Sequence, residues 1–177
     1  MKVKRWIEDH KIPFIPVAVI VLIAGIAAYF LIRFIFLSGM EYTFYYPDLH
    51  FQKMSSEPRA IYLDPVTEYF EKKLVQDYFL GPLKYELRMP IDDDLQVTDI
   101  WFVDDGKTKG IVINFADKLN QYIKERNDSV VWLIQGLVMT LKANTGVKHV
   151  ILLERGNRIP EGVYIGKWQP AFPIPVE

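Results

Sequence analysis

The sequence lacks the residue types and motifs on which many catalytic and metal sites depend. Its 177 residues include no cysteine, which excludes disulfide bonds, thiolate nucleophiles, zinc–thiolate sites and a lipid-modified N-terminal cysteine. Histidine is scarce, occurring only as His10, His50 and His149. A glycine-rich phosphate loop, a Gly-x-Ser-x-Gly turn and a His-Glu-x-x-His helix are all absent. We therefore expect no enzyme activity, no cofactor and no metal site.

Runs of basic residues are also missing. The formal net charge is −1, and the chain after residue 38 holds more Asp and Glu than Lys and Arg. Proteins that bind DNA or RNA present clustered positive charge to the phosphate backbone. The sequence therefore predicts no nucleic-acid partner.

One long apolar segment, from Ile12 to Leu37, contrasts with the rest of the chain. It is interrupted only by prolines near its start and by Arg33 near its end, and its length suffices to cross a bilayer. Lys2, Lys4, Arg5 and Lys11 precede it, whereas only Arg33 lies near its far end. The positive-inside bias therefore places residues 1–11 in the cytoplasm and everything after Ser38 outside it. This pattern predicts a single-pass protein of the cytoplasmic membrane with an extracytoplasmic C-terminal domain.

A cleaved signal peptide is the competing interpretation of this segment. Gly25-Ile26-Ala27 has the small-x-small pattern of a cleavage site. However, Tyr29-Phe30-Leu31-Ile32 continues the apolar run directly past that site. The uncleaved anchor is therefore the favoured interpretation.

The remaining chain shows alternating strand and helix signals. Helical periodicity predicts helices at 64–80 and 129–143. Runs of β-branched and aromatic residues predict strands at 42–46, 59–63, 95–103, 111–115 and 147–153. The alternation of the third strand slips near Thr98-Asp99, as a β-bulge would cause. This order predicts an α+β fold, a compact two-helix, mainly antiparallel-sheet sandwich with strand-helix-strand-strand-helix-strand connectivity after the transmembrane helix.

Two glycines are predicted to have a structural role at helix ends. Gly81, followed by Pro82, comes directly after the first predicted helix. Gly146 follows the second helix, after Asn144-Thr145. Because helices commonly end with a residue in the left-handed conformation, we expect positive φ at both glycines.

Four segments resemble the GerMN domain of sporulation, germination and other bacterial envelope proteins. They are Phe79-Leu80-Gly81-Pro82, Ile111-Val112-Ile113-Asn114-Phe115, residues 135–141 and residues 144–150, and the resemblance covers roughly residues 59–162. It implies an exported, membrane-attached domain whose fold is similar to that of ring-building modules, and hence a role in assembly. Many such proteins are lipoproteins, whereas this cysteine-free chain would depend on its apolar helix.

The resulting domain organisation has five parts. They are a basic cytoplasmic tail at 1–11, a transmembrane helix at 12–37, a juxtamembrane segment at 38–58, a GerMN-like domain at 59–167, and a proline-rich tail at 168–177 that runs extended over the surface.

One face of the second predicted helix is a candidate interaction surface. Trp132, Gly136, Met139 and Ala143 fall together opposite the apolar core stripe. An aromatic, a methionine and two small residues are unusual on a face that should be solvated. Either this face binds a partner, or the tail or a loop covers it.

Other polar residues have simpler explanations. Asp92-Asp93-Asp94 offers the oxygen ligands that calcium needs, but it lacks the spacing of a calcium loop, which favours a solvated turn. Asp104-Asp105 precedes Gly106 and is explained as a turn. His149 has no serine or carboxylate motif around it, which favours an outward-facing strand residue over a general base.

These observations predict a non-catalytic interaction or assembly module of the bacterial cell envelope, held in the inner membrane. Its expected partners are copies of itself, other envelope proteins and peptidoglycan. An envelope hydrolase is one alternative. Another is a monomeric binder of glycan or peptide that uses aromatic side chains at Trp101, Tyr122, Trp132 or Trp168.

Overall fold

The computed structural model describes residues 14–37, 40–61, 69–91, 95–104 and 106–176. Within the first of these ranges, side chains are described only for residues 19–31. The chain divides into two compact units, Met1–Gly39 and Met40–Glu177.

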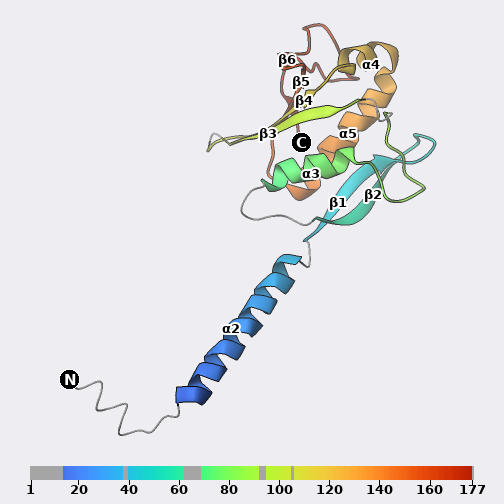
Figure 1. Cartoon of the computed structure of the whole chain (residues 1–177). Helices are drawn as coiled ribbons and strands as arrows, with labels where there is room; N and C mark the ends of the chain where they lie inside the picture. Colours follow the sequence, from blue (N-terminus) through green and yellow to red (C-terminus); the bar gives the residue numbers. More distant parts are fainter. Residues whose placement is uncertain (1–13, 38–39, 62–68, 92–94, 105, 177) are drawn as a thin grey trace. The chain divides into compact units, whose positions relative to one another are not determined.

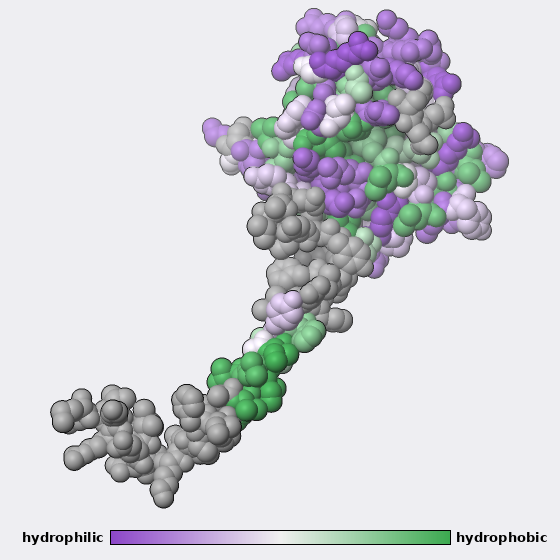
Figure 2. Space-filling view, viewed as in Figure 1, coloured by the Kyte–Doolittle hydropathy of each residue, from purple (hydrophilic) through white to green (hydrophobic). Residues whose placement is uncertain are grey.

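The first unit contains the helix α2 (Phe14–Leu37), whose described side chains are mostly hydrophobic (Figure 2). In the part of the chain that the structure describes, no helix is both long enough and apolar enough to cross a membrane. The prediction of a single-pass inner-membrane protein with a cytoplasmic N-terminus is therefore wrong.

The second unit begins with a β-hairpin. Strand β1 (Met40–Pro47) pairs antiparallel with β2 (Met54–Ile61) and the two form a separate sheet. The predicted strand at 42–46 is confirmed. Strand β2 starts several residues before the predicted position, so part of the segment expected to be juxtamembrane belongs to the folded unit. Its polar sequence concealed the strand because only its alternate side chains are buried.

The larger sheet has the order β3-β4-β5-β6, with β7 also pairing with β5. Its strands are β3 (Val97–Asp104), β4 (Lys109–Phe115), β5 (His149–Glu154), β6 (Asn157–Arg158) and β7 (Ile174–Pro175). The bulge in β3 is confirmed between Val97 and Asp99. The β3–β4 pair is antiparallel, but the central β4–β5 pair is parallel because two helices connect the end of β4 to the start of β5. The sheet is therefore mixed.

Three helices accompany the two sheets in this unit's described residues: α3 (Phe70–Phe79), α4 (Leu119–Glu125) and α5 (Asn127–Asn144). Helix α5 matches the prediction within a few residues. Helix α3 begins later than predicted, after Tyr69 in an extended conformation, and residues 64–68 of the predicted helix lie outside the described residues. Helix α4 was not predicted, since its seven residues are too few to show a clear periodicity.

Helix α5 lies between the two sheets, and α3 lies beside it against β3 (Figure 1). Side chains on one face of the larger sheet, such as Ile100, Ile113 and Leu152, are buried against these helices. Phe44 and Tyr46 of β1 are fully buried on the other side of α5. One continuous core therefore joins the hairpin, the helices and the larger sheet.

The C-terminal tail is part of the sheet, and it does not simply run extended over the surface. Ile174 pairs with Val150 and is buried, and the backbone N–H of Val176 donates to the carbonyl oxygen of Lys148 at 3.0 Å. The tail thus protects one end of the edge of β5 from solvent.

Candidate functional site

The face of α5 that the sequence marked as a candidate interaction surface meets the chain's own hairpin. The N–H of Thr43 donates to Asn144 Oδ1 at 3.0 Å, and Asn144 Nδ2 donates back to the Thr43 carbonyl at 2.7 Å. One helical turn earlier, Thr140 Oγ1 accepts from the N–H of Tyr45 at 3.0 Å. Residues four apart on a helix are spaced like residues two apart on a strand, so α5 side chains serve as partners for the edge of β1.

Gly136 continues this row by one more turn, and its lack of a side chain permits close packing. A Cβ atom at this position would lie 2.5 Å from the Tyr78 hydroxyl and 2.6 Å from the Tyr45 carbonyl oxygen. Tyr78 is fully buried and donates from its hydroxyl to the Leu133 carbonyl at 2.8 Å. Burial raises the pKa of Tyr78 well above its usual value, so the side chain remains a neutral donor.

The four predicted interface residues therefore do not form one free surface. Gly136 is buried, Trp132 and Met139 are half-buried, and Ala143 is exposed. The ring of Trp132 lies 6.2 Å from that of Phe51, in the connection between β1 and β2. The hairpin packs against Gly136 and Trp132, while Ala143 stays exposed.

A buried ion pair fixes the turn after α3 to the same hairpin. Glu57 of β2 is 1% exposed and pairs with Arg59. Its carboxylate also accepts from the backbone N–H groups of Leu83 and Lys84 at 2.9 and 2.8 Å. Burial by itself would raise the pKa of Glu57, but these hydrogen bonds and the charge of Arg59 together hold it below its ordinary value.

Arg59 satisfies carbonyl groups at the end of α3. Its guanidinium donates to the carbonyl oxygens of Asp77 at 3.0 Å and Gly81 at 2.8 Å. Gly81 has φ of +84°, as the sequence predicted. Its neighbour Pro82 is half-buried in the turn that follows. The segment that resembles the Leu-x-Gly-Pro motif is thus a docking turn and contains no chemical group suited to catalysis.

Gly146 behaves differently from the prediction, because it is not among the residues with positive φ. Thr145, in an extended conformation, ends α5. Its hydroxyl donates to the Leu141 carbonyl at 2.7 Å and accepts from the N–H of Val147 at 3.2 Å. A threonine side chain therefore supplies the helix end that the sequence analysis assigned to glycine.

The candidate chemical groups do not converge on a site. Residues 92–94 and 105 lie outside the described residues, and Asp104 accepts from the N–H of Gly106 at 2.9 Å, as a turn aspartate does. His149 is half-buried at the start of β5. Within the described ranges, no group of three or more histidine or acidic side chains is placed to hold a metal ion.

The four aromatics considered for glycan binding come from separate elements. Trp101 is 45% exposed on β3, Tyr122 is buried on α4, Trp132 packs beside Phe51, and Trp168 is half-buried in the C-terminal segment. No ring contact joins any two of the four in the described part of the chain. They do not form a shared stacking platform.

The larger sheet has an open face, which we define as Trp101, Val103, Val112, Ile151 and Leu153. Trp101, Val112 and Ile151 are paired across three neighbouring strands. Trp101 and Val103 are 45% and 49% exposed, and the other three are half-buried. Because side chains alternate along a strand, this row points away from the helices, opposite to Ile100 and its neighbours. Sequence reasoning noted Trp101 but not the row, which depends on strand register.

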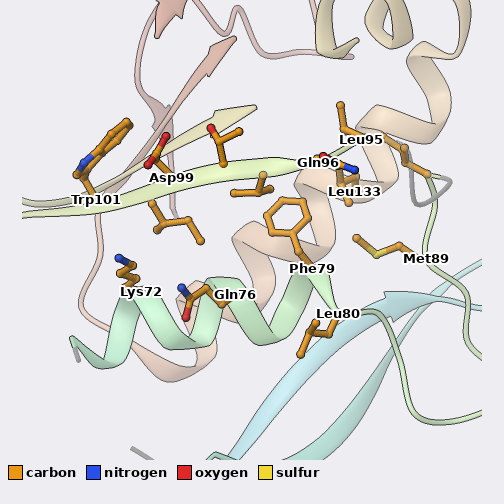
Figure 3. Close-up of a pocket in the computed structure, with 14 residues that line it drawn as sticks. Lys72, Gln76, Phe79, Leu80, Met89, Leu95, Gln96, Asp99, Trp101 and Leu133 are labelled. Carbon is orange, nitrogen blue, oxygen red and sulfur yellow. The ribbon is translucent and has the colours of Figure 1, made fainter. Parts of the chain in front are cut away.

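A groove of about 520 Å³ separates α3 from the edge strand β3 (Figure 3). Its floor is apolar, with Phe79, Leu133 and Ile100 among the lining residues. Lys72 and Gln76 of α3 lie along one side of it (Figure 3). No sequence pattern indicated this groove, since its lining comes from helix, strand and loop residues that are distant in the chain.

The chain matches no protein-family model, and no curated protein is similar in sequence. Among solved structures it is similar to the first GerMN domain of the sporulation protein GerM from Bacillus subtilis, with 20% identity, 69% of this chain and 87% of that chain covered, and a TM-score of 0.49. For the tandem GerMN domains of the same protein, the identity is 16%, the match covers 67% of this chain and 40% of that chain, and the TM-score is 0.45.

The chain is also similar to the solved structure of a Clostridium perfringens protein that is provisionally assigned as a lipoprotein. The identity is 18%, the match covers 77% of this chain and 87% of that chain, and the TM-score is 0.46. These structures include the domain type that the sequence motifs resemble. At this level of similarity they do not by themselves assign the chain to a family.

Proposed function

We propose that Met40–Glu177 forms a non-catalytic interaction domain that assembles with copies of itself or with other proteins of the bacterial cell envelope. The motif resemblance to GerMN domains motivates the envelope context. The observation that carries the proposal is the open face, where a tryptophan and a valine are each nearly half exposed beside three half-buried aliphatic residues. Contiguous exposed apolar side chains with an aromatic residue are typical of protein contact surfaces.

The open face would supply affinity by removing apolar surface from water. Trp101 has the largest side chain of the open face, and its row with Val112 and Ile151 crosses three paired strands. A rigid aromatic side chain loses little conformational entropy on binding, so it suits the centre of an interface. Such a contact needs no acid, base or metal.

The test is chemical cross-linking in the bacterium that produces the protein, followed by sedimentation of the purified full chain over a range of concentrations. We expect cross-linked adducts for the wild type and at least fivefold fewer for Trp101→Thr. Tyr85→Thr is the matched control, because Tyr85 is 89% exposed but outside the open face. Adducts that form equally in both variants, or no adducts in the wild type, would contradict the proposal.

The two kinds of partner give different results in this test. Self-assembly would appear as concentration-dependent sedimentation of the purified chain and as adducts at multiples of its mass. A different envelope protein would give adducts of other masses while the purified chain sediments as one species. Either result must depend on Trp101 for the open face to be the contact.

A further inference from the structure

The groove between α3 and β3 is built like a site for an extended chain. It runs beside β3, which is the terminal strand of the larger sheet among the described residues. Its volume of about 520 Å³ lies within the range of roughly 300–1,000 Å³ typical of ligand pockets. Phe79, Leu133 and Ile100 line it with apolar surface, and Ile100 and Leu133 are buried. An apolar side chain that entered the groove would therefore leave water.

The edge of β3 provides hydrogen-bonding groups along this groove. Strand β3 pairs with β4 on one side only, so alternate backbone N–H and C=O groups point away from the sheet. Just before β3, the carbonyl oxygen of Gln96 accepts a hydrogen bond from the N–H of Ala116, which follows β4. This bond lies on the β4 side, and no backbone hydrogen bond to the opposite edge of β3 is found in the described part of the chain. A second extended segment could satisfy the outward-pointing groups by adding a strand.

Lys72 gives the groove a charge. It is half-buried in the first turn of α3, and its ammonium group points toward β3 (Figure 3). No hydrogen bond or ion pair of Lys72 is found within the described ranges, whereas the adjacent Lys73 is paired with Asp77 at 3.1 Å. Asp99, also at the groove, accepts from Asn114 Nδ2 at 3.3 Å on the far side of the sheet. By strand alternation the Asp99 carboxylate lies on the face of β3 opposite Ile100, so the charge on the α3 side of the groove is the positive one of Lys72.

We propose that this groove binds an extended, acidic peptide segment of a partner protein. The segment pairs with the edge of β3, places an apolar side chain against Phe79 and Leu133, and brings a carboxylate to the Lys72 ammonium. Backbone pairing supplies affinity, while the apolar position and the carboxylate supply specificity. This inference deepens the proposed interaction function, but it concerns a site distinct from the open face, with only Trp101 bordering both.

The probe is a displayed library of random octapeptides with free C-termini, selected on the full chain, after which enriched peptides are synthesised and titrated. We expect sequences with β-branched residues and an acidic group or a terminal carboxylate at a fixed position. Lys72→Met should weaken binding of such a peptide at least tenfold, and Lys72→Arg should retain most of it. Lys142→Met, an exposed lysine of α5 outside the groove, should change binding less than twofold.

Backbone pairing is tested by N-methylating the peptide at one position at a time. Because alternate amides of a strand face its neighbour, methylation at every second position should abolish binding and the intervening positions should tolerate it. No enriched sequence, binding that is indifferent to Lys72→Met, or a methylation profile without alternation would overturn the proposal. Weak binding by soluble cell-wall peptides with no such alternation would also count against it.

A further variant separates this inference from the proposed function. Val112→Thr changes the open face without touching the groove. Loss of cross-linked adducts with intact peptide binding in this variant would show two independent sites. Loss of peptide binding in Lys72→Met with unchanged adducts would support the groove whatever the fate of the open face.

Discussion

Two strand edges in the folded unit are treated in opposite ways. The edge of β1 that faces α5 donates hydrogen bonds to Thr140 and Asn144 and accepts one from Asn144, so side chains of a helix take the place of a neighbouring strand. The edge of β3 receives no comparable bonds in the part of the chain that the structure describes. In the first arrangement, backbone groups of β1 form hydrogen bonds that hold the hairpin against α5. In the second, backbone N–H and C=O groups of β3 remain available to bind another strand. Substitutions on the closed side should therefore change stability, and those on the open side should change binding.

The largest effect is expected for Glu57→Ala on β2, the other strand of the hairpin. This change leaves the guanidinium of Arg59 buried without its carboxylate and frees the N–H groups of Leu83 and Lys84. Removing one partner of a buried pair costs about 3–5 kcal/mol. Chemical denaturation should show this loss in the free energy of unfolding. A loss below about 1 kcal/mol would mean that the pair does not hold the turn after α3 on the hairpin.

The same carboxylate predicts how stability depends on pH. The pKa of Glu57 is lower in the folded chain than its ordinary value of 4.5, so the unfolded chain binds the proton more tightly. The stabilisation is therefore fully present above pH 4.5 and is lost as the pH falls through the lower folded pKa. Thermal unfolding of Glu57→Gln should show a flatter acid limb than the wild type. Parallel acid limbs would contradict the assignment.

Gly136→Ala should be the next most destabilising change. The added Cβ meets the Tyr45 carbonyl and the Tyr78 hydroxyl at distances that force the hairpin or α5 to shift. Overpacking typically costs about 1–3 kcal/mol, which exceeds the roughly 1 kcal/mol that alanine gains over glycine in a helix. The free energy of unfolding measures the balance.

Gly146→Ala is the matched control for this change. Gly146 has no heavy atom within 4 Å of an added Cβ, and its φ is not positive. It should therefore change the free energy of unfolding by less than about 0.5 kcal/mol. Equal losses at the two glycines would show that close packing between α5 and the hairpin is unimportant.

The contrast between these two glycines shows what the sequence could predict. Local signals located α5, most strands, the bulge near Asp99 and the positive φ of Gly81, because each depends on neighbouring residues. The burial of Gly136 depends on Tyr45, and the bond from Tyr45 to Thr140 joins residues 95 positions apart. No helical periodicity reports such a partner, so a face that packs against its own hairpin looked like a free surface.

The same limit applied to the groove and the open face. The parallel pairing of β4 with β5 sets which residues share a row, and a strand's own sequence does not reveal its neighbours. Trp101 was therefore visible as one aromatic residue, while its alignment with Val112 and Ile151 was not. The groove required α3 to lie beside β3, which sequence patterning did not specify.

Asn144→Ala tests the closed edge of β1 directly. It removes both hydrogen bonds to Thr43 and the bond to the Thr140 carbonyl at 2.7 Å. We expect a loss of about 1–2 kcal/mol in the free energy of unfolding, since the Thr43 groups are left partly buried without partners. Hydrogen exchange should also become faster at the N–H of Thr43. Lys142→Ala, an exposed neighbour on α5, should leave both measurements unchanged.

The smallest effect on stability is expected for Trp101→Thr on the open face. The side chain is already 45% exposed, and threonine suits a strand, so the free energy of unfolding should fall by about 1 kcal/mol or less. The same variant should lose most of its cross-linked adducts, because the area that Trp101 contributes lies outside the core. A large loss of stability would instead mean that the row with Val112 and Ile151 belongs to the packing of the folded unit. Unchanged stability together with lost association is the combination that distinguishes an open surface from the closed edge of β1.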